Sequence, residues 1–200
     1  MSSHYYSRTP DVKSDPKYWD FTLKDHQFRF KSDLGVFSKN EVDYGSRVLI
    51  EAFEIPETAG PVLDVGCGYG PIGLSIAKTN EDRVVHMVDV NQRALALADE
   101  NAKANGIGNV QIYESDRLLG VQEKEFAAIV TNPPIRAGKK VVHDIFIQSH
   151  QHLAVNGELW VVIQKKQGAP SAKAKLEGLF AEVQVVAKDK GYFIIKAKKH

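Results

Sequence analysis

The sequence predicts an α/β fold in which a doubly wound sheet of seven strands is mostly parallel and ends in an antiparallel hairpin. Two observations support this prediction. Short β-branched runs alternate with segments of helical periodicity between residues 62 and 163, which is the pattern of parallel βαβ units. The last two runs, residues 183–187 and 192–195, are separated by only four residues, too few for a crossover helix. The sheet therefore ends in an antiparallel pair.

Residues 1–35 are expected to form an extension ahead of this sheet. Apolar side chains alternate with polar ones over residues 19–23 and again over 28–30, and a polar link joins the two runs. This spacing predicts a short β-hairpin. From residue 41 to residue 53 the periodicity becomes helical. The main domain is placed at residues 36–200.

Five runs are expected as parallel strands: 62–65, 84–88, 110–113, 127–130 and 159–163. The helix after the second run begins at Asn91, whose side chain can cap it, and Gly106 ends it. Another helix is predicted over 138–153, with its end marked by Asn156 and Gly157. Its inward residues are expected to be Val142, Ile145, Phe146, Ser149 and Leu153.

Composition excludes several classes of protein. No stretch reaches the ~18 to 20 consecutive apolar residues of a membrane span, and the first ten residues lack the apolar core of a signal peptide. We therefore expect a cytoplasmic protein with no membrane partner. The single cysteine, Cys67, excludes an internal disulfide and a CxxC metal knuckle. The histidines show no third ligand, so no metal is expected.

The net charge of +1 conceals an uneven distribution. Residues 165–200 hold nine lysines against three acidic residues, a local charge of +6, so the first 164 residues carry −5. A basic segment can form a surface that meets phosphates, although such runs are commonly just solvated.

A glycine-rich turn follows the first core strand, from Asp64 to Gly73. It satisfies two patterns: GxGxxG, which cradles a dinucleotide pyrophosphate, and DxGxGxG, which suits a ligand with a cationic amino-acid portion. The carboxylate of Asp64 would repel a pyrophosphate but can hold an ammonium, directly or through water. This favours S-adenosylmethionine over NAD as the cofactor. The loop residues assigned to it are Gly66, Cys67, Gly68 and Gly70.

Two further acidic positions follow the next strands. Asp89, with Val90 beside it, ends the second strand, where a carboxylate can accept both ribose hydroxyls of a nucleoside. Asp116 follows the third strand and could accept from an adenine amino group, although a helix cap or loop carboxylate explains it nearly as well.

The fourth strand runs into Asn132-Pro133-Pro134-Ile135. Two prolines fix the backbone, so the Asn132 side-chain oxygen and the Pro133 carbonyl form a rigid pair of acceptors. Such a pair can draw a planar exocyclic amine toward tetrahedral geometry and aim its lone pair at a sulfonium methyl. The other interpretation is a plain turn. Its position at the same sheet edge as the glycine loop favours chemistry.

These motifs resemble class I, S-adenosylmethionine-dependent methyltransferases of the small-domain family, and in particular the ribosomal RNA guanine-N2 branch that modifies the small-subunit RNA. The resemblance extends from about Lys31 to Lys198 and is carried by residues 35–38 with 43–46, 63–70 and 132–138. It implies that Asn132 and Pro133 bind the target amine and that Asp64 and Asp89 bind the cofactor, with Asn132 also counted among the cofactor-binding residues. It also implies that the segment of Phe37 and Asp43 covers the methionine end of the cofactor.

Two departures from that family matter. Many amino-methyltransferases carry an aromatic residue after the second proline, where this chain has Ile135. Some relatives also carry a preceding, degenerate methyltransferase domain, in whose place this chain has only the hairpin. RNA contacts, to small-subunit ribosomal RNA or an assembling small subunit, are then expected from basic residues beside the turn and after the fifth strand: Arg136, Lys139, Lys140, Lys165 and Lys166.

Three alternatives to guanine-N2 methylation stay open. Adenine N6 and the side-chain amide of a protein glutamine are also planar nitrogens that Asn-Pro-Pro could hold. A different class is an NAD-dependent oxidoreductase that uses GxGxxG. A third is a noncatalytic RNA-binding module, against which the intact Asn132-Pro133-Pro134 argues. The sequence leaves the oligomeric state and the modified nucleotide undefined.

Overall fold

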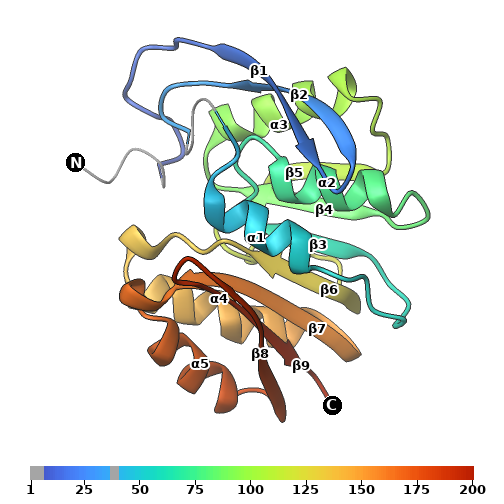
Figure 1. Cartoon of the computed structure of the whole chain (residues 1–200), viewed down its shortest axis with the longest axis vertical. Coiled ribbons are helices and arrows are strands. Elements are labelled where there is room, and N and C mark those ends of the chain that lie inside the picture. The colour runs from blue at the N-terminus through green and yellow to red at the C-terminus, as the bar shows by residue number, and fades with distance from the viewer. Residues whose placement is uncertain (1–6, 37–40) are drawn as a thin grey trace.

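The computed structural model describes residues 7–36 and 41–200. The strands of its main sheet are β3 (Val62–Val65), β4 (Val85–Asp89), β5 (Val110–Glu114), β6 (Phe126–Thr131), β7 (Leu153–Gln164), β8 (Glu182–Asp189) and β9 (Tyr192–Lys198). In the described residues these seven strands run in the order β5-β4-β3-β6-β7-β9-β8 (Figure 1). Strand β9 pairs antiparallel with both β7 and β8, and the other neighbours pair parallel. The predicted Rossmann-like fold is confirmed.

Helices cover both faces of the sheet. Helices α1 (Tyr44–Ala52), α2 (Pro71–Thr79) and α3 (Gln92–Ala104) bury apolar residues in one core cluster. Helices α4 (Lys139–His152) and α5 (Ala169–Glu177) do so in a second cluster on the other face. Figure 1 shows α4 behind β7 and α5 beside β8. Each helix has one apolar side because its neighbour is a sheet.

The predicted N-terminal hairpin is present and packs into the main core. Strands β1 (Lys17–Leu23) and β2 (His26–Ser32) pair around Lys24 and Asp25, whose φ values of 48° and 63° are those of a two-residue type I′ turn. Its buried side chains Leu23, Phe28 and Phe30 belong to the cluster of α1–α3.

Side-chain amides of α3 pair with the outer edge of β2. Asn105 accepts from the Arg29 N–H at 2.9 Å and donates to the Arg29 carbonyl at 2.9 Å. Asn101 does the same for Lys31, at 2.8 and 2.9 Å. These contacts satisfy backbone groups that an edge strand would otherwise leave to water, so the extension is fastened to the domain.

Two boundaries differ from the sequence expectation. The C-terminal hairpin turns on two residues, Lys190 and Gly191 with φ of 46° and 80°, because residues 188 and 189 extend β8. Helix α4 ends at His152, one residue before the predicted end at 153, and Asn156 and Gly157 do not mark that end, since Leu153 already pairs with Phe126. Asn156 and Gly157 instead lie where the β6–β7 register shifts, which is a bulge within β7. The predicted inward residues of α4 are all buried.

Candidate functional site

A cavity of about 600 Å³ opens at the carboxyl edge of the sheet, beside the point where the strand order reverses between β3 and β6. Ligands of open α/β sheets bind at such switch points. Its walls bring together the glycine loop, the end of β4, the Asn-Pro-Pro turn and the start of β9. The predicted site residues among them are Asp43, Gly66, Cys67, Gly68, Asp89, Val90, Asn132, Pro133, Pro134, Ile135 and Arg136.

The glycine loop is shaped for a ligand that lies against the backbone. Gly66, Gly68 and Gly70 have φ values of +74°, +58° and +109°, which side-chain-bearing residues rarely adopt. A Cβ on Gly66 or Gly68 would enter space with no atom within 4 Å. Gly70 does not line the cavity; it is the N-cap of α2 and precedes Pro71. Cys67 lines the wall, and burial raises the pKa of its thiol, so it is no thiolate nucleophile.

Asp64 lies behind this loop rather than on the cavity wall. It is 1% exposed, and its Oδ2 accepts from the Gly73 N–H at 2.9 Å, which ties β3 to the first turn of α2. Its Oδ1 is buried without a hydrogen-bond partner among the described residues. Burial raises the pKa of this carboxyl to about 7.

The raised pKa of Asp64 gives stability a definite pH dependence. Between 3.8, the ordinary pKa, and about 7, the native protein keeps a proton on Asp64 that the unfolded chain has lost. The free energy of unfolding therefore falls as pH rises through this window, by up to ~1.4 kcal/mol per pH unit from this group. We expect Asp64→Asn to remove that component. Urea titrations of ligand-free protein from pH 4 to 8 measure the free energy of unfolding of the variant and the wild type. The free energy of the variant should rise relative to that of the wild type as pH rises. A difference between the two that does not change with pH would contradict the prediction.

Asp89 occupies the position expected of a ribose acceptor. Its Oδ2 accepts from the Gly68 N–H and its Oδ1 from the Asn91 N–H, both at 2.9 Å, and the side chain is partly buried on the cavity wall. Burial raises the pKa of its carboxyl. A carboxylate offers about four lone-pair sites, so Asp89 keeps acceptor capacity for hydroxyl donors beside its backbone contacts. The same contacts hold the glycine loop against the end of β4.

Asp116 is directed to its neighbour instead of the cavity. Both of its carboxylate oxygens pair with the Arg117 guanidinium at 2.9 Å, and Arg117 also reaches Asp144 at 2.7 Å. Arg117 and Ser115 line the cavity, whereas Asp116 does not. The structure thus brings the neighbours of Asp116 to the site. The sequence reasoning missed both residues, although an Asp-Arg pair beside a strand end is a visible signal.

The Asn-Pro-Pro turn is tightly built. Pro134 has φ −76° and ψ 81°, and the Ile135 N–H donates to the Pro133 carbonyl at 2.9 Å, which is an inverse γ-turn. A carbonyl has a second lone pair, so this bond leaves the Pro133 oxygen one further place. The Asn132 Nδ2 donates to Asp43 Oδ2 and to Ser46 Oγ, both at 3.1 Å. Both N–H groups of the Asn132 amide are thereby engaged on the α1 side.

Three residues that the sequence reasoning missed complete the far wall: Gln164, Gln167 and Tyr192. Gln164 ends β7 and pairs in register with Tyr192 at the start of β9. A Cβ at Gly45 would come within 2.8 Å of the Tyr192 ring, so a side chain there would force the ring to move. Tyr44 packs against the same ring, with centroids 5.7 Å apart. No local sequence motif predicts that Tyr192 lines the cavity, because its position depends on the pairing of β9 with β7.

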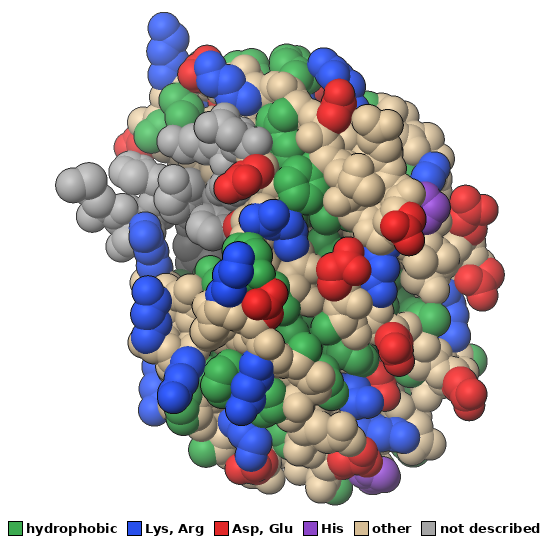
Figure 2. All heavy atoms as spheres, viewed as in Figure 1, with side chains coloured by type: hydrophobic (Ala, Val, Ile, Leu, Met, Phe, Trp, Pro, Cys, Tyr) green, Lys and Arg blue, Asp and Glu red, His purple; other side chains and the backbone are tan. Residues whose placement is uncertain are grey.

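The predicted RNA-contacting residues lie along the same edge. Arg136 is on the cavity wall, Lys139 and Lys140 begin α4, and Lys165 and Lys166 form a short 3-10 turn after β7; all five are exposed. Figure 2 shows Lys and Arg side chains gathered along the left and lower left, with acidic side chains more frequent on the right. The charge partition seen in the sequence thus has a counterpart on this face.

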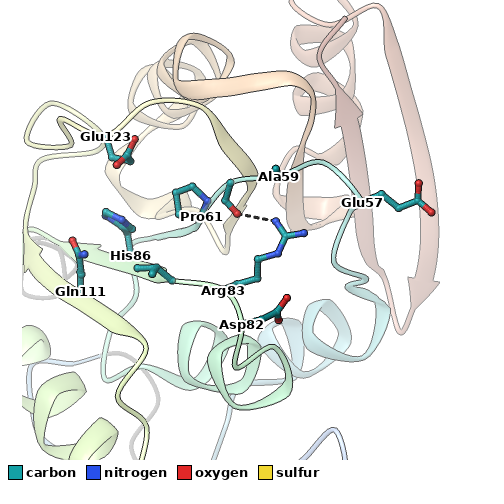
Figure 3. A pocket seen from close by; sticks show the side chains of 10 residues that line it. Glu57, Ala59, Pro61, Asp82, Arg83, His86, Gln111 and Glu123 are labelled. Atoms are coloured by element: carbon teal, nitrogen blue, oxygen red, sulfur yellow. Dashed lines mark hydrogen bonds between the residues drawn. The ribbon is translucent and has the colours of Figure 1, made fainter.

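A second hollow of about 520 Å³ lies at the opposite, amino edge of the strands. Figure 3 shows Arg83 reaching the loop near Ala59 and Pro61, where its guanidinium donates to the Gly60 and Thr58 carbonyls at 2.8 Å. His86 contacts the Tyr113 hydroxyl at 2.8 Å. Arg83 and His86 are therefore both hydrogen-bonded to neighbouring groups of the chain.

Phe37 lies outside the described residues. Within the described ranges no cluster of three or more His, Cys, Asp or Glu side chains could hold a metal ion. The helices described here include none that is long and apolar enough to cross a membrane.

Comparison with known proteins agrees with this geometry. A family model described as methyltransferase small domain matches residues 27–196. The chain is 64% identical over its whole length to an uncharacterised protein, YbxB, from Bacillus subtilis. It is 30% identical to ribosomal RNA small subunit methyltransferase C of Vibrio parahaemolyticus, over 92% of this chain and 53% of that protein. It is also 30% identical to ribosomal RNA large subunit methyltransferase G of Streptomyces avermitilis, over 82% of this chain and 44% of that protein. The chain spans about half the length of these named methyltransferases.

Among solved structures, the chain resembles the T. thermophilus 16S rRNA N2 G1207 methyltransferase (RsmC) in complex with AdoMet and guanosine. The TM-score is 0.82 at 25% identity, over 96% of this chain and 52% of that one. Together with the family model, this likeness confirms S-adenosylmethionine as the cofactor rather than NAD. Since the family model extends over most of its length, the chain belongs to the methyltransferase small domain family.

Proposed function

We propose that this protein transfers a methyl group from S-adenosylmethionine to the exocyclic N2 amine of a guanine in small-subunit ribosomal RNA. The observation that carries the proposal is the Asn132 amide. Its two N–H groups are used by Asp43 and Ser46, so the side-chain oxygen is the group left for an amine, in the same cavity as the glycine loop.

The cavity fits the cofactor on two counts. The space above Gly66 and Gly68 is open where a Cβ would project, and Asp64 holds an unsatisfied buried oxygen behind the loop. We assign Asp89 to the ribose hydroxyls and the charge of Asp64 to the cationic amino-acid end, acting through the loop or a water. Val90 and the backbone of Gly68 then border the nucleoside. When bound, S-adenosylmethionine supplies a methyl group activated by a sulfonium.

The residues of the turn prepare the acceptor for that methyl. Hydrogen bonds from the two amine N–H groups to the Asn132 oxygen and the Pro133 carbonyl would oppose delocalisation of the nitrogen lone pair. The lone pair then forms the N–C bond as the S–C bond breaks, S-adenosylhomocysteine leaves, and the amine proton is lost to water. No strong base is required, so the chain contributes positioning and electrostatics.

The far wall of the cavity favours a nucleobase. Ile135 offers only apolar contact beside the turn, but Tyr192 presents an aromatic ring to the same cavity. An aromatic face stacks on a base extruded from its helix. The amides of Gln164 and Gln167 can pair with the N1–H and O6 edge of guanine, next to its N2 amine. Adenine presents only one acceptor, N1, beside its N6 amine and has no counterpart of the guanine N1–H and O6 pair, which makes adenine N6 the second candidate.

The basic edge predicts a salt-dependent interaction with RNA. The first turn of α4 has no side-chain cap and carries Lys139 and Lys140, an arrangement that is unfavourable without an anion nearby. We expect Lys165→Ala/Lys166→Ala to weaken RNA binding and to flatten the slope of log affinity against log salt by roughly 0.7 per lost phosphate contact. Lys103→Ala, on the exposed face of α3, is the control. An unchanged slope in a filter-binding titration would assign Lys165 and Lys166 to solvation.

The acceptor is tested by methyl transfer. Labelled S-adenosylmethionine is incubated with unmethylated small subunits, large subunits and deproteinised RNA from each, and the label is measured in the RNA and protein fractions. We expect label in small-subunit RNA. Label in large-subunit RNA alone, or in protein, would overturn the proposed substrate, as would the absence of transfer to all of them. A cytoplasmic location is part of the same proposal.

A further inference from the structure

The amide of Asn132 is held by two side chains from one helix turn far away in the chain. Its Nδ2 donates to Asp43 Oδ2 and to Ser46 Oγ at 3.1 Å each, across 89 and 86 residues. A carboxylate oxygen can only accept, so these contacts distinguish the two ends of the amide. They direct the N–H groups of Asn132 toward α1, so its side-chain oxygen lies at the end of the amide that faces away from these two acceptors.

One oxygen of Asp43 serves two purposes. Asp43 is the N-cap of α1, and the Oδ2 that reaches Asn132 also accepts from the Ser46 N–H at 3.0 Å. Capping the helix requires only the contact with the Ser46 N–H. Ser46 is 3% exposed, and Leu49 of the same helix is fully buried, so this helix turn has little freedom to move. The helix thus provides a fixed support for the side chain of Asn132.

The charge of Asp43 also affects the far end of the amide. An N–H group that donates to a carboxylate is polarised, and polarisation along a hydrogen-bonded chain strengthens the carbonyl oxygen as an acceptor. Asp43, Ser46 and Asn132 all line the cavity, where the effect would meet an incoming amine.

We propose that Asp43 and Ser46 are positioning residues that hold the Asn132 amide in the orientation required to accept the target amine. The sequence assigned Asp43 to the cofactor; here it acts on the acceptor side through Asn132. The proposal rests on the proposed function only in that the Asn132 oxygen binds an amine, whichever amine that is.

The test separates capping from positioning. Asp43→Asn keeps an oxygen that can accept both contacts and removes only the charge. Asp43→Ser keeps a good N-cap, but its hydroxyl is too short to reach Asn132. Ser46→Ala removes the second acceptor. For each variant, kcat and the acceptor KM are measured at saturating cofactor, with the dissociation constant of S-adenosylhomocysteine by calorimetry and the melting temperature. The readout that a purely structural role would not move is kcat at unchanged stability.

We expect Asp43→Ser to lower kcat by about 10- to 100-fold, with the cofactor dissociation constant within about threefold and the melting temperature preserved. Ser46→Ala should lower kcat by a smaller factor, and Asp43→Asn, which keeps the contact but loses the charge, should also lower kcat by less than Asp43→Ser does. Full activity in Asp43→Ser, or a loss that appears only as weaker cofactor binding, would overturn the proposal.

A double-mutant cycle keeps this result apart from the proposed function. In an Asn132→Ala background, Asp43→Ser should cause no further loss of kcat, because the positioned group is gone. If Asn132→Ala alone leaves kcat unchanged, the proposed role of Asn132 fails. If Asn132→Ala abolishes transfer and Asp43→Ser does not slow it, only the positioning role fails.

Discussion

Replacing Asn132 with alanine should lower kcat by roughly 10²- to 10³-fold while cofactor affinity changes by less than tenfold. The reason is that the Asn132 oxygen is proposed to bind the amine most strongly as the nitrogen becomes tetrahedral, so its loss is a transition-state effect. The backbone should persist, because Pro133 and Pro134 fix the turn and the Ile135 N–H still donates to the Pro133 carbonyl. Single-turnover methyl transfer at saturating cofactor, together with calorimetry of S-adenosylhomocysteine, measures both quantities.

A matched control separates this effect from general damage. Gln111 is an exposed polar residue at the opposite edge of the sheet, beside His86 in Figure 3, and Gln111→Ala should keep kcat. Equal activity of Asn132→Ala and the wild type would remove Asn132 from the acceptor site. A fall in kcat that accompanies a fall in melting temperature would point to unfolding. The value of kcat is therefore measured well below the melting temperatures of the variant and the wild type.

Asp89→Ala should instead weaken cofactor binding and leave kcat at saturating cofactor largely unchanged. Two hydroxyl contacts to a carboxylate are worth about 1.5–3 kcal/mol each, so the dissociation constant should rise at least tenfold, and toward 10³-fold if both are fully lost. Part of the lost cofactor affinity would come from a less ordered glycine loop, because the Gly68 and Asn91 N–H groups also lose their acceptor.

Asp89→Asn helps to divide these two contributions. The amide keeps one oxygen acceptor and adds donors, so it should hold part of the loop but bind the ribose poorly. Calorimetry with S-adenosylhomocysteine checks both variants, and kcat at saturating cofactor should be largely retained. A dissociation constant equal to that of the wild type in Asp89→Ala would exclude this residue from the ribose site.

The strand runs, the terminal hairpin and the cap of α3 could be predicted because their signals are local. β-branched runs mark the strands, a link of a few residues excludes a crossover, and Asn91 accepts from the Ala94 N–H as its position suggests. The glycine loop and the Asn-Pro-Pro turn could be placed at one edge for the same reason, since parallel strands bring their carboxyl ends together.

The rest of the site depends on packing that no local pattern encodes. Asp64 lies one residue before the end of β3, and its side chain is directed under the loop to Gly73 instead of into the cavity. Tyr192 reaches the wall only through its pairing with Gln164. Asp43 has a recognisable capping position, but its contact with Asn132 requires α1 to pack beside the end of β6.

The account is tested most directly by identifying the methylated nucleoside. Ribosomal RNA that has received labelled methyl from the wild-type protein is digested to nucleosides and separated by chromatography with mass detection. The label should migrate as N2-methylguanosine, and RNA treated with Asn132→Ala should carry almost none of it. Label in N6-methyladenosine, or in a ring-methylated guanosine, would contradict the proposed delivery of the guanine N2 amine to Asn132.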